Sequence, residues 1–484
     1  MAALRFYLDG ERVEIAAVEP TRTLLQYLRE DLRRVGSKEG CAEGDCGACT
    51  VVIAELVDDA LRYRAVNACI QFLPTLDGKA LFTVESLKSA TGELHPVQQS
   101  MVDYHGSQCG FCTPGFVMSM FALYLHNPAP TRADIDDALS GNLCRCTGYR
   151  PIIDACRHMY DYPRVAPAES ELIQGLRGLR RDSGLTLEFE RSRYHAPITV
   201  AALAALYLEQ PEARILAGGT DVGLWVTKQL RELPTLIYLG NVAELRQVNR
   251  SSAGVEIGAA VALTDAAAAI IEHYPELSDM FRRFASVPVR NAGTLVGNVA
   301  NGSPIGDSMP ALIAIGTRVR LRRGDQQREL ALEDLYLDYM QNALQPGEFI
   351  ESILIPARDE SLLLRCYKLS KRFDQDISAL CAAFALRLDG DRVTRIRIAL
   401  GGMAAIPKRA LQTEQLLLGK SWNESNIEIA MRELRAEFTP LSDMRASAAY
   451  RSRASANLLT RFYLETRPGQ ALEASALNVF AVTA

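Results

Sequence analysis

Alternating apolar and polar residues open the chain and predict a β-hairpin. Leu4 to Leu8 alternate loosely, Asp9-Gly10 supplies a tight turn, and Arg12 to Ile15 return as a second strand. One amphipathic helix should follow, because apolar residues then recur with helical spacing: Leu24, Leu25, Leu28 and Leu32. With further strand-like segments at Thr50–Ala54 and Leu61–Val66, residues 1–86 are expected to form a small α+β domain.

The period of the pattern becomes helical from about Val84. Four helices are predicted, at about residues 95–105, 115–126, 132–140 and 151–161. Pro114 suits the first turn of the second helix, and Thr131 with Asp134 resembles a capping box for the third. Residues 87–163 are therefore expected to form a four-helix domain.

The remaining sequence predicts a linker, two further domains and a tail. Residues 164–190 are polar without a sustained apolar period, which indicates a linker. An α/β domain is expected at 191–360, and a small α+β domain at 361–465, where Val393–Ile398 alternates as a half-buried strand. Residues 466–484 are expected to be a loose tail. The fold class is thus α+β and multidomain, as a length of 484 residues also suggests.

Four cysteines of the first domain have the spacing of iron ligands. They are Cys41, Cys46, Cys49 and Cys69, in the order C-x4-C-x2-C followed by a distant fourth, which is the plant-type pattern for a 2Fe-2S cluster. Gly40, Gly44 and Gly47 allow the tight loop that such ligation needs. A zinc knuckle is the alternative, but zinc sites usually pair cysteines in matched C-x2-4-C half-sites.

A second set of four cysteines lies in the predicted helical domain. It consists of Cys109, Cys112, Cys144 and Cys146. Zinc is a stronger alternative here because C-x2-C is common in zinc sites, although C-x-C is too tight for the usual half-site. The neighbouring first set favours a second 2Fe-2S cluster. Cys156, Cys366 and Cys381 are left over and are interpreted as buried small apolar side chains.

Composition narrows the classes of function. A formal charge of -5 with mixed signs gives no broad basic surface, so a nucleic-acid partner is not expected. No apolar run approaches the roughly 18 residues of a membrane span, and no signal-peptide core precedes the first strand. The eleven cysteines are odd in number and crowded, and there are only six histidines. This usage predicts a cytoplasmic metal-thiolate protein rather than a disulfide framework or a histidine-built hydrolase.

Glycine-rich turns mark the third domain. The strand-like Arg214–Ala217 runs into Gly218–Gly223, and Val289–Asn298 leads to Gly302–Asp307. Such turns allow backbone N–H groups to approach a diphosphate closely. The chain contains no G-x-G, so the Rossmann dinucleotide fingerprint is absent, and a dinucleotide bound here would use another fold.

These segments together resemble the iron–sulfur and flavin subunits of the molybdenum hydroxylase family, and most of all the small subunits of the bacterial xanthine dehydrogenase type. The resemblance covers about residues 1–465, and it is carried by Gly40–Cys49 with Cys69, Gln108–Gly115, Asn142–Pro151, Gly218–Asp221 and Gly293–Asp307. It implies a ferredoxin-like β-grasp 2Fe-2S domain, a four-helix 2Fe-2S domain, an FAD-binding domain of the vanillyl-alcohol-oxidase type and a flavoprotein C-terminal domain.

The resemblance also implies where the cofactors bind. The first cysteine set would hold the cluster that faces the flavin, and the second set the cluster that faces the molybdenum centre. FAD would contact Ile215, Leu216, Ala217, Gly218, Gly219, Thr220, Asp221, Val222, Phe284, Thr294, Leu295, Val296, Gly297, Asn298, Asp307, Ile350 and Lys368. Gly219 is a departure, because many relatives have Asn at this position.

A partner subunit is expected as well. The molybdopterin domains of single-chain relatives are missing from this sequence, so substrate hydroxylation and its catalytic residues are expected on a separate large subunit that binds the molybdenum cofactor. By the resemblance, two small and two large subunits would oxidise hypoxanthine and xanthine to urate and pass the electrons to NAD+.

Two alternatives remain open. The same electron-transfer role could serve a hydroxylase for aldehydes, other N-heterocycles or thioesters. The second and more distant alternative is that the chain is a zinc-stabilised interaction scaffold. The loop Lys371–Asp376 is a candidate contact for NAD+, although a surface charge cluster explains it equally well.

Overall fold

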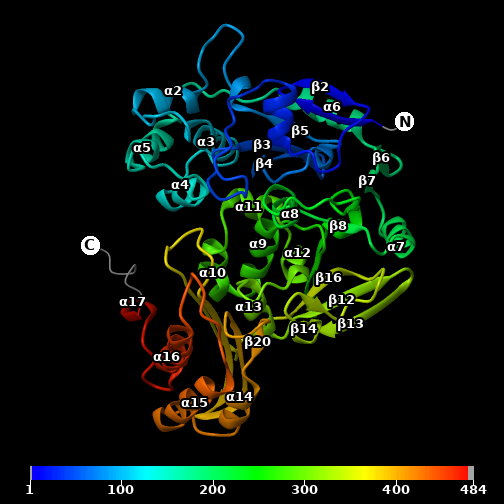
Figure 1. The fold of residues 1–484 in the computed structure, drawn as a ribbon. Coiled ribbons are helices and arrows are strands. Elements are labelled where there is room, and N and C mark those ends of the chain that lie inside the picture. Colours follow the sequence, from blue (N-terminus) through cyan, green and yellow to red (C-terminus); the bar gives the residue numbers. More distant parts are fainter. Residues whose placement is uncertain (1–2, 478–484) are drawn as a thin grey trace. The chain divides into compact units, whose positions relative to one another are not determined.

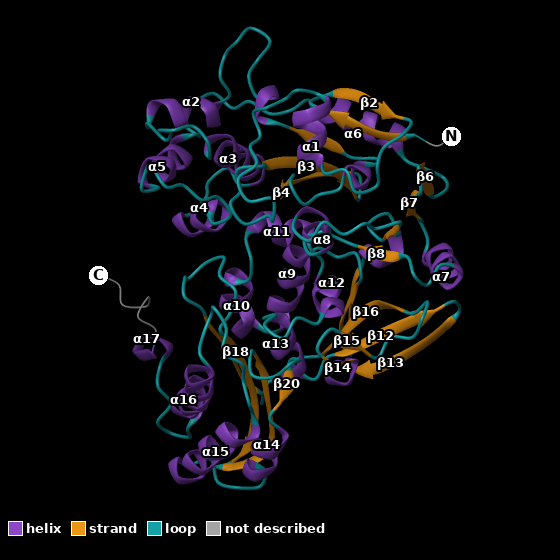
Figure 2. Ribbon diagram, viewed as in Figure 1, coloured by secondary structure: helices purple, strands orange, loops and turns teal. Residues whose placement is uncertain are grey.

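A computed structural model describes residues 3–477, and these form two compact units (Figure 1, Figure 2). The first unit comprises residues 3–246, 262–264 and 285–294, and the second comprises 247–261, 265–284 and 295–477. Helices and sheets of both units give the mixed α/β architecture that the sequence predicts. The boundaries of the four domains within these units stay predictions.

The first unit begins with a five-stranded sheet of order β2-β1-β5-β3-β4. Its strands are β1 (Leu4–Leu8), β2 (Glu11–Ile15), β3 (Thr50–Val57), β4 (Ala60–Asn67) and β5 (Ala80–Phe82). The predicted hairpin is confirmed, and Asp9 and Gly10 take the positive φ values of 52° and 90° typical of a tight hairpin turn. The predicted helix is a short α1 (Leu24–Gln26) that continues as a π-helix (Tyr27–Asp31), and it buries Leu24, Leu25 and Leu28 against the sheet.

The four predicted helices of the next segment are confirmed. They are α2 (Pro96–Asp103), α3 (Thr113–His126), α4 (Arg132–Leu139) and α5 (Arg150–His158). Phe116, Met120 and Ile152 are fully buried in the shared core of this cluster. Cys112 of the second set is the N-cap of α3, and Cys144 and Cys146 lie in the loop that leads from α4 to α5.

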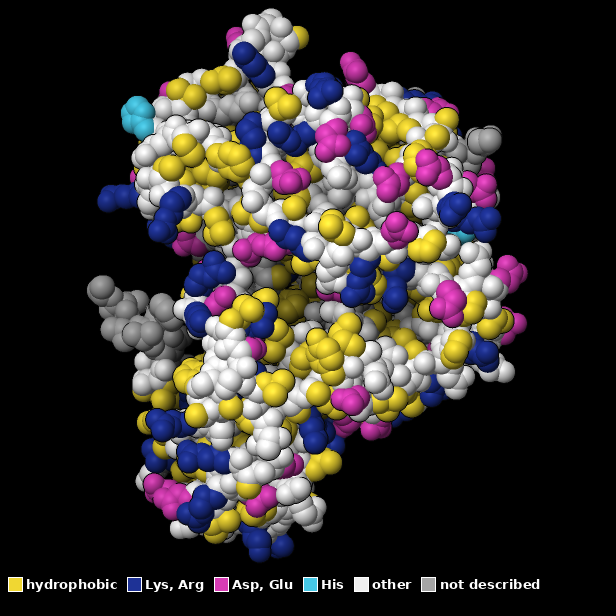
Figure 3. All heavy atoms as spheres, in the orientation of Figure 1, with side chains coloured by type: hydrophobic (Ala, Val, Ile, Leu, Met, Phe, Trp, Pro, Cys, Tyr) yellow, Lys and Arg dark blue, Asp and Glu magenta, His cyan; other side chains and the backbone are white. Residues whose placement is uncertain are grey.

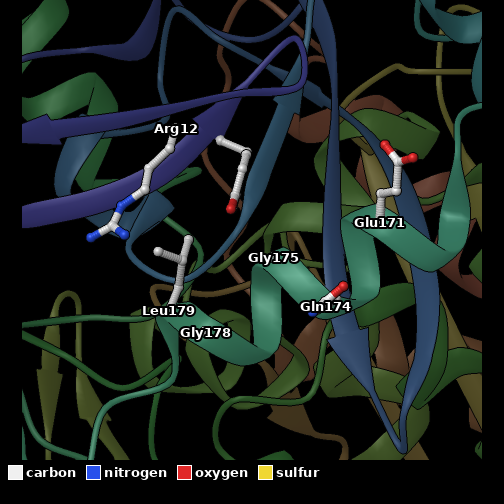
Figure 4. Close-up of a pocket in the computed structure, with 7 residues that line it drawn as sticks. Arg12, Glu171, Gln174, Gly175, Gly178 and Leu179 are labelled. Carbon is white, nitrogen blue, oxygen red and sulfur yellow. The ribbon is translucent and has the colours of Figure 1, made fainter.

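The predicted linker is wrong for much of its length, because residues 169–179 form helix α6 (Glu169–Leu179). Leu172, Leu176 and Leu179 repeat with helical spacing and are buried, with 8%, 1% and 2% of their surface exposed. Glycines and arginines between them hide this period in the sequence. Gly175 lets the helix approach the sheet, since a Cβ there would lie 2.7 Å from the Tyr7 ring. A pocket beside α6 is lined by Tyr7, Arg12, Glu171, Gln174, Gly175, Gly178 and Leu179 (Figure 4).

A second sheet of the first unit has the order β6-β7-β9-β8. It consists of β6 (Leu185–Phe189), β7 (Ser192–Ala196), β8 (Arg214–Leu216) and β9 (Thr235–Tyr238), and it is accompanied by α7 (Val200–Glu209), α8 (Val222–Thr227) and α11 (Val287–Ala292). Strands β7, β9 and β8 are parallel, so the glycine loop that follows β8 leaves from a carboxyl edge of the sheet. Ligands of α/β proteins bind at such edges.

The second unit is built on two sheets of orders β10-β11-β16-β12-β13 and β17-β18-β19-β20, with a small hairpin β14-β15. The strands are β10 (Val248–Ser251), β11 (Gly254–Gly258), β12 (Arg318–Arg323), β13 (Gln326–Ala331), β14 (Tyr336–Asp338), β15 (Gln341–Asn342), β16 (Phe349–Pro356), β17 (Leu363–Leu369), β18 (Leu380–Asp389), β19 (Arg392–Gly401) and β20 (Lys408–Arg409). Its helices are α9 (Leu263–His273, of which the first two residues belong to the first unit), α10 (Ser278–Arg283), α12 (Leu295–Asn301), α13 (Ser308–Ile315), α14 (Leu411–Leu417), α15 (Glu424–Glu437), α16 (Ala448–Thr466) and α17 (Ala474–Leu477). The predicted tail therefore contains the short α17, and its last seven residues, 478–484, lie outside the described residues.

Charged side chains of both signs are scattered over the face of the molecule that Figure 3 shows, without a continuous basic area. Across residues 3–477, no helix combines the length and the apolar character needed to cross a bilayer.

Candidate functional site

The first cysteine loop curls as the glycines predict. Cys41, Cys46 and Cys49 lie between the π-helix and β3, and Cys69 follows β4. The loop has left-handed backbone at Ala42, Gly44 and Gly47, with φ values of 54°, 80° and 71°. The backbone N–H of Cys46 donates to Sγ of Cys41 over 3.4 Å, which is the contact expected for a sulfur that carries negative charge.

The thiols of this set interact with one another. Cys41 interacts with Cys46 and Cys69, and Cys69 interacts in turn with Cys49. The interaction with the Cys46 and Cys69 thiols lowers the pKa of Cys41, whereas interaction with its neighbours and burial raise the pKa of Cys69. These thiols thus share hydrogen bonds with one another, and a metal bound by all four would replace the shared protons.

The second cysteine set is more open to solvent. Cys109 and Cys146 are exposed, Cys112 is half-buried and Cys144 is buried. Cys112 interacts with Cys144, and Cys109 with Cys146. Burial raises the pKa of the Cys112 thiol to about 12. Burial also opposes ionisation of Cys144, but hydrogen bonds outweigh it and lower the pKa of this thiol: Thr147 Oγ1 lies 3.2 Å and the Thr147 N–H 3.5 Å from Sγ.

Each set therefore gathers the four cysteines that the sequence selects. Among residues 3–477, no group of three or more His, Cys, Asp or Glu side chains is arranged as it stands to hold a metal ion. The thiols instead contact each other, in a chain in the first set and in pairs in the second, and backbone N–H groups donate to sulfur in both sets. Four thiols in each set suit a 2Fe-2S cluster, and the individual ligands stay predictions.

The two cysteine loops are joined directly. The Leu143 N–H donates to the Cys46 carbonyl over 3.0 Å, and Leu143 immediately precedes Cys144. Asn142 is 2% exposed; its Nδ2 donates to the Gly47 carbonyl at 3.0 Å and to Thr50 Oγ1 at 3.2 Å, and its Oδ1 accepts from Ser119 at 2.6 Å. A Cβ at Gly47 would lie 2.1 Å from the Gly141 carbonyl oxygen. One hydrogen bond and a few covalent bonds thus connect a cysteine of the first set to a cysteine of the second.

The predicted FAD contacts fall in both units. Within the first unit, Ile215 and Leu216 end strand β8, Ala217 to Asp221 form the glycine loop, and Val222 begins α8. This loop packs closely on the segment before α12, because a Cβ at Gly218 would lie 1.9 Å from the Ala292 carbonyl oxygen, and Thr294 follows in the same segment. The backbone therefore gives the glycine loop a fixed place at the carboxyl edge of β8.

Within the second unit, Lys368 and Asp307 form a buried ion pair. Lys368 Nζ lies 2.6 Å from Asp307 Oδ2, and the two side chains are 1% and 4% exposed. Ser378 completes the cluster, accepting from Lys368 at 2.8 Å and donating to the other oxygen of Asp307 at 2.5 Å. Asn298 of α12 accepts from Ser308 Oγ at 2.5 Å, directly beside Asp307. The Lys368 ammonium and the Asp307 carboxylate are thus shielded from water side by side, which suits binding of the polar edge of a flavin.

The other predicted FAD contacts of this unit take up separate positions. Phe284 follows α10, Leu295, Val296 and Gly297 form the first turn of α12, and Ile350 is a buried residue of β16. The loop Lys371–Asp376 is tied down by Lys371 Nζ, which donates to the Met444 carbonyl over 2.7 Å. Of the leftover cysteines, Cys156 and Cys381 are fully buried as expected, while Cys366 is only half-buried.

Two polar residues of these clusters were assigned no role in the sequence analysis. Asn142 lies two positions before Cys144, and Ser378 lies in a charged loop ten residues after Lys368. Their types carry no ligand signal, since Asn and Ser are common turn residues. Only the fold brings Asn142 to the first cysteine loop and Ser378 to the ion pair.

Comparisons with known proteins agree with this arrangement segment by segment. Four family models match in order along the chain: a 2Fe-2S iron-sulfur cluster binding domain at residues 6–73, a 2Fe-2S binding domain at 83–157, the FAD binding domain in molybdopterin dehydrogenase at 187–358, and the CO dehydrogenase flavoprotein C-terminal domain at 365–466. The chain belongs to the molybdenum hydroxylase family. It has the iron–sulfur and flavin domains of that family, and the zinc alternative for the cysteine sets is thereby disfavoured.

Relatives within the molybdenum hydroxylases include enzymes of different specificity. Xanthine dehydrogenase of Emericella nidulans is 32% identical over 95% of this chain, and aldehyde oxidase of Homo sapiens is 30% identical over 96%. The chain spans only 38% and 39% of the length of these two relatives. Among solved structures, a carbon monoxide dehydrogenase chain from Hydrogenophaga pseudoflava is similar with a TM-score of 0.53 and 28% identity, over 56% of this chain and 95% of that one.

Proposed function

We propose that this chain is the electron-transfer subunit of a xanthine dehydrogenase. It would take electrons from a partner subunit that holds the molybdenum cofactor and oxidises hypoxanthine and xanthine to urate. It would pass them through the second and then the first cysteine set to FAD, and from there to NAD+. When bound, each 2Fe-2S cluster supplies one-electron chemistry, and FAD accepts electrons singly and releases them as a hydride.

The direction of this transfer is inferred from the surroundings of the two cysteine sets. The second set reaches the surface at Cys109 and Cys146, beside the partly exposed apolar side chains of Phe111 and Tyr149. Such a surface suits the approach of a protein partner, because aromatic side chains are favoured in interfaces. The first set is more buried and packs beside the glycine loop that follows β8. Electrons would therefore enter at the second set, although it comes later in the chain.

The chain's own residues have distinct tasks in this proposal. Cysteine thiolates hold iron, and backbone and Thr147 hydrogen bonds to sulfur stabilise their negative charge. Asn142 fixes the distance between the two sets. In the second unit, the Lys368–Asp307 pair and Ser378 would orient FAD while excluding water.

The observation that carries the proposal is the direct hydrogen bond from Leu143 to Cys46, which joins the two cysteine loops in one unit. The test is to prepare the full chain anaerobically with its copurifying partner. Metal and flavin analysis should give about four irons and one FAD per chain, because each plant-type cluster holds two irons. Added xanthine should then bleach the iron–sulfur absorption and reduce NAD+. Absence of flavin, or zinc in place of iron, would rule out the role.

An aldehyde substrate is the second candidate, because aldehyde oxidase is nearly as similar as xanthine dehydrogenase. The partner subunit would decide between them. The same preparation should therefore be offered an aldehyde and a purine separately. Bleaching by the aldehyde alone would keep the electron-transfer role and change the substrate.

We also propose that the assembly contains two copies of each subunit, which the mass of the purified complex would check. A location in the cytoplasm is proposed as well, and cell fractionation would check it.

A further inference from the structure

Ile70, the residue after the ligand Cys69, is enclosed by three glycines from two distant segments of the first unit. Ile70 is 3% exposed. A Cβ at Gly223 would lie 2.6 Å from the Ile70 carbonyl oxygen and 3.0 Å from its Cβ, and one at Gly219 would lie 3.1 Å from the same oxygen. On the other side, a Cβ at Gly44 would lie 2.5 Å from Ile70 Cδ1. Ile70 thus touches the first cysteine loop and the glycine loop with α8 at once.

A second pair of contacts clamps α8 to the same cysteine loop. Thr227 Oγ1 donates to the Ala42 carbonyl over 2.7 Å, and Ala42 is the neighbour of Cys41. Lys228 and Glu43 form an ion pair with 3.7 Å between Nζ and Oε2. The loop predicted to bind FAD and the loop that carries three cysteines are therefore held together at two points. We call the packing of Ile70 against Gly219 and Gly223 the Ile70 contact.

Helix stability alone does not explain glycine at position 223. Gly223 lies in the first turn of α8, where alanine would stabilise the helix better. Gly219 has a φ of 73°, which glycine adopts freely, and it replaces the Asn expected from relatives. At Gly223 the backbone comes closer to Ile70 than a Cβ would permit, and at Gly219 a Cβ would be tight against the Ile70 carbonyl oxygen. Close approach matters for electron tunnelling, because the rate falls exponentially with the gap between donor and acceptor.

We propose that the Ile70 contact is the point where electrons cross from the first cluster to the flavin. Gly219 and Gly223 are positioning residues, and Thr227 is their clamp. Cys69 would hold the cluster and the glycine loop would hold the flavin; with both bound, single electrons would pass from cluster to flavin without any covalent bond forming or breaking, and the protons taken up by the flavin would come from water. The proposal rests on the electron-transfer function proposed above.

Gly223→Ala tests the contact, because the added methyl group meets backbone atoms that must move apart. The matched control is Gly178→Ala, a helix glycine of the same unit whose Cβ would meet nothing within 4 Å. Each full-length protein is loaded with iron, sulfide and excess FAD. One electron is delivered by pulse radiolysis, and flavin reduction by the cluster is followed optically. Redox titration with electron paramagnetic resonance (EPR) gives the potentials of both centres.

Gly223→Ala should slow electron transfer from cluster to flavin while flavin content, EPR spectra and both potentials stay as in the wild type, and Gly178→Ala should change none of these. A wild-type rate in Gly223→Ala would overturn the proposal. If this variant binds no flavin, Thr227→Val decides, because it removes the clamp without adding bulk: slower transfer supports the Ile70 contact and an unchanged rate overturns it. Absence of flavin or clusters in the wild-type protein would instead refute the proposed function.

Discussion

The two cysteine sets each offer four thiols but have different surroundings. The first set lies in a loop with three left-handed residues, buries Cys49 and Cys69, and contacts other parts of its own unit. The second set lies at the starts of two helices, exposes Cys109 and Cys146, and has Phe111 and Tyr149 partly exposed beside it. On the proposed function, the buried set would exchange electrons with the flavin and the exposed set with the partner subunit, so the fold around the sulfurs would decide the role of each cluster.

Gly47→Ala should have the largest effect and should disturb both cysteine sets, because Gly47 lies where the two cysteine loops contact each other. The added Cβ would lie 2.1 Å from the Gly141 carbonyl oxygen, and φ is 71°. We expect both clusters to be lost or the protein to fail to fold. Gly78→Ala is the matched control, with a φ of 76° and open space around the Cβ. It should cost only the ~1–2 kcal/mol of left-handed strain. Equal melting temperatures and iron contents for the two variants would contradict the close junction.

Removing one ligand from each set should separate the two clusters. Cys69→Ser and Cys146→Ser are each expected to lower the iron content from about four to about two per chain, since each cluster holds two irons. Each variant should lose a different EPR signal from the reduced protein. Cys156→Ala, which changes a buried thiol outside both sets, should keep all the iron. Loss of both signals in the Cys146 variant would show that the sets do not act as separate sites.

Asn142→Asp should weaken the joint without removing a ligand. The new carboxylate has the same shape but donates neither to the Gly47 carbonyl nor to Thr50 Oγ1, and it places a buried negative charge beside that carbonyl oxygen. We expect a loss of stability of about 1–3 kcal/mol, seen as a lower melting temperature. Asn249→Asp on the exposed edge strand β10 is the control and should change stability little. An unaltered melting temperature for Asn142→Asp would mean that Asn142 does not hold the loops together.

Thr147→Val should have the smallest effect and touch the second set alone. It removes the hydroxyl that lies 3.2 Å from Sγ of Cys144. A hydrogen bond to sulfur favours the more negative, reduced cluster, so its loss should lower the reduction potential. A net value of ~0.5–1.5 kcal/mol per hydrogen bond corresponds to about 20–60 mV for one electron. EPR-monitored titration should find this shift in the signal lost in Cys146→Ser, and none in the other signal.

The sequence predicts the local parts of this molecule well, because its signals are local. Hairpin, helices and cysteine spacing each depend on residues that are close in the chain, and the structure has them nearly where expected. Helix α6 was missed because Gly175 and Gly178 interrupt its apolar stripe, and glycine is normally unfavourable in helices. Gly175 is explained only by the Tyr7 ring that packs against the helix, and nothing in the structure explains Gly178.

Contacts between distant segments could not be predicted from the pattern. Asn142 meets Gly47 across 95 positions, and Lys368 meets Asp307 across 61. The resemblance to a family named Lys368 and Asp307 but gave no reason for pairing them; it included Asn142 in a motif without a role, and it did not name Ser378. Such residues act through partners that only the folded backbone brings within reach, which is why residue type and spacing do not reveal them.

EPR of the reduced full chain in the presence of a soluble relaxing agent tests the contrast between the two sets most directly. The account predicts two distinct 2Fe-2S signals, of which the one lost in Cys146→Ser is strongly relaxed by the agent and the one lost in Cys69→Ser is much less affected. A single signal, or stronger relaxation of the signal that depends on Cys69, would contradict it.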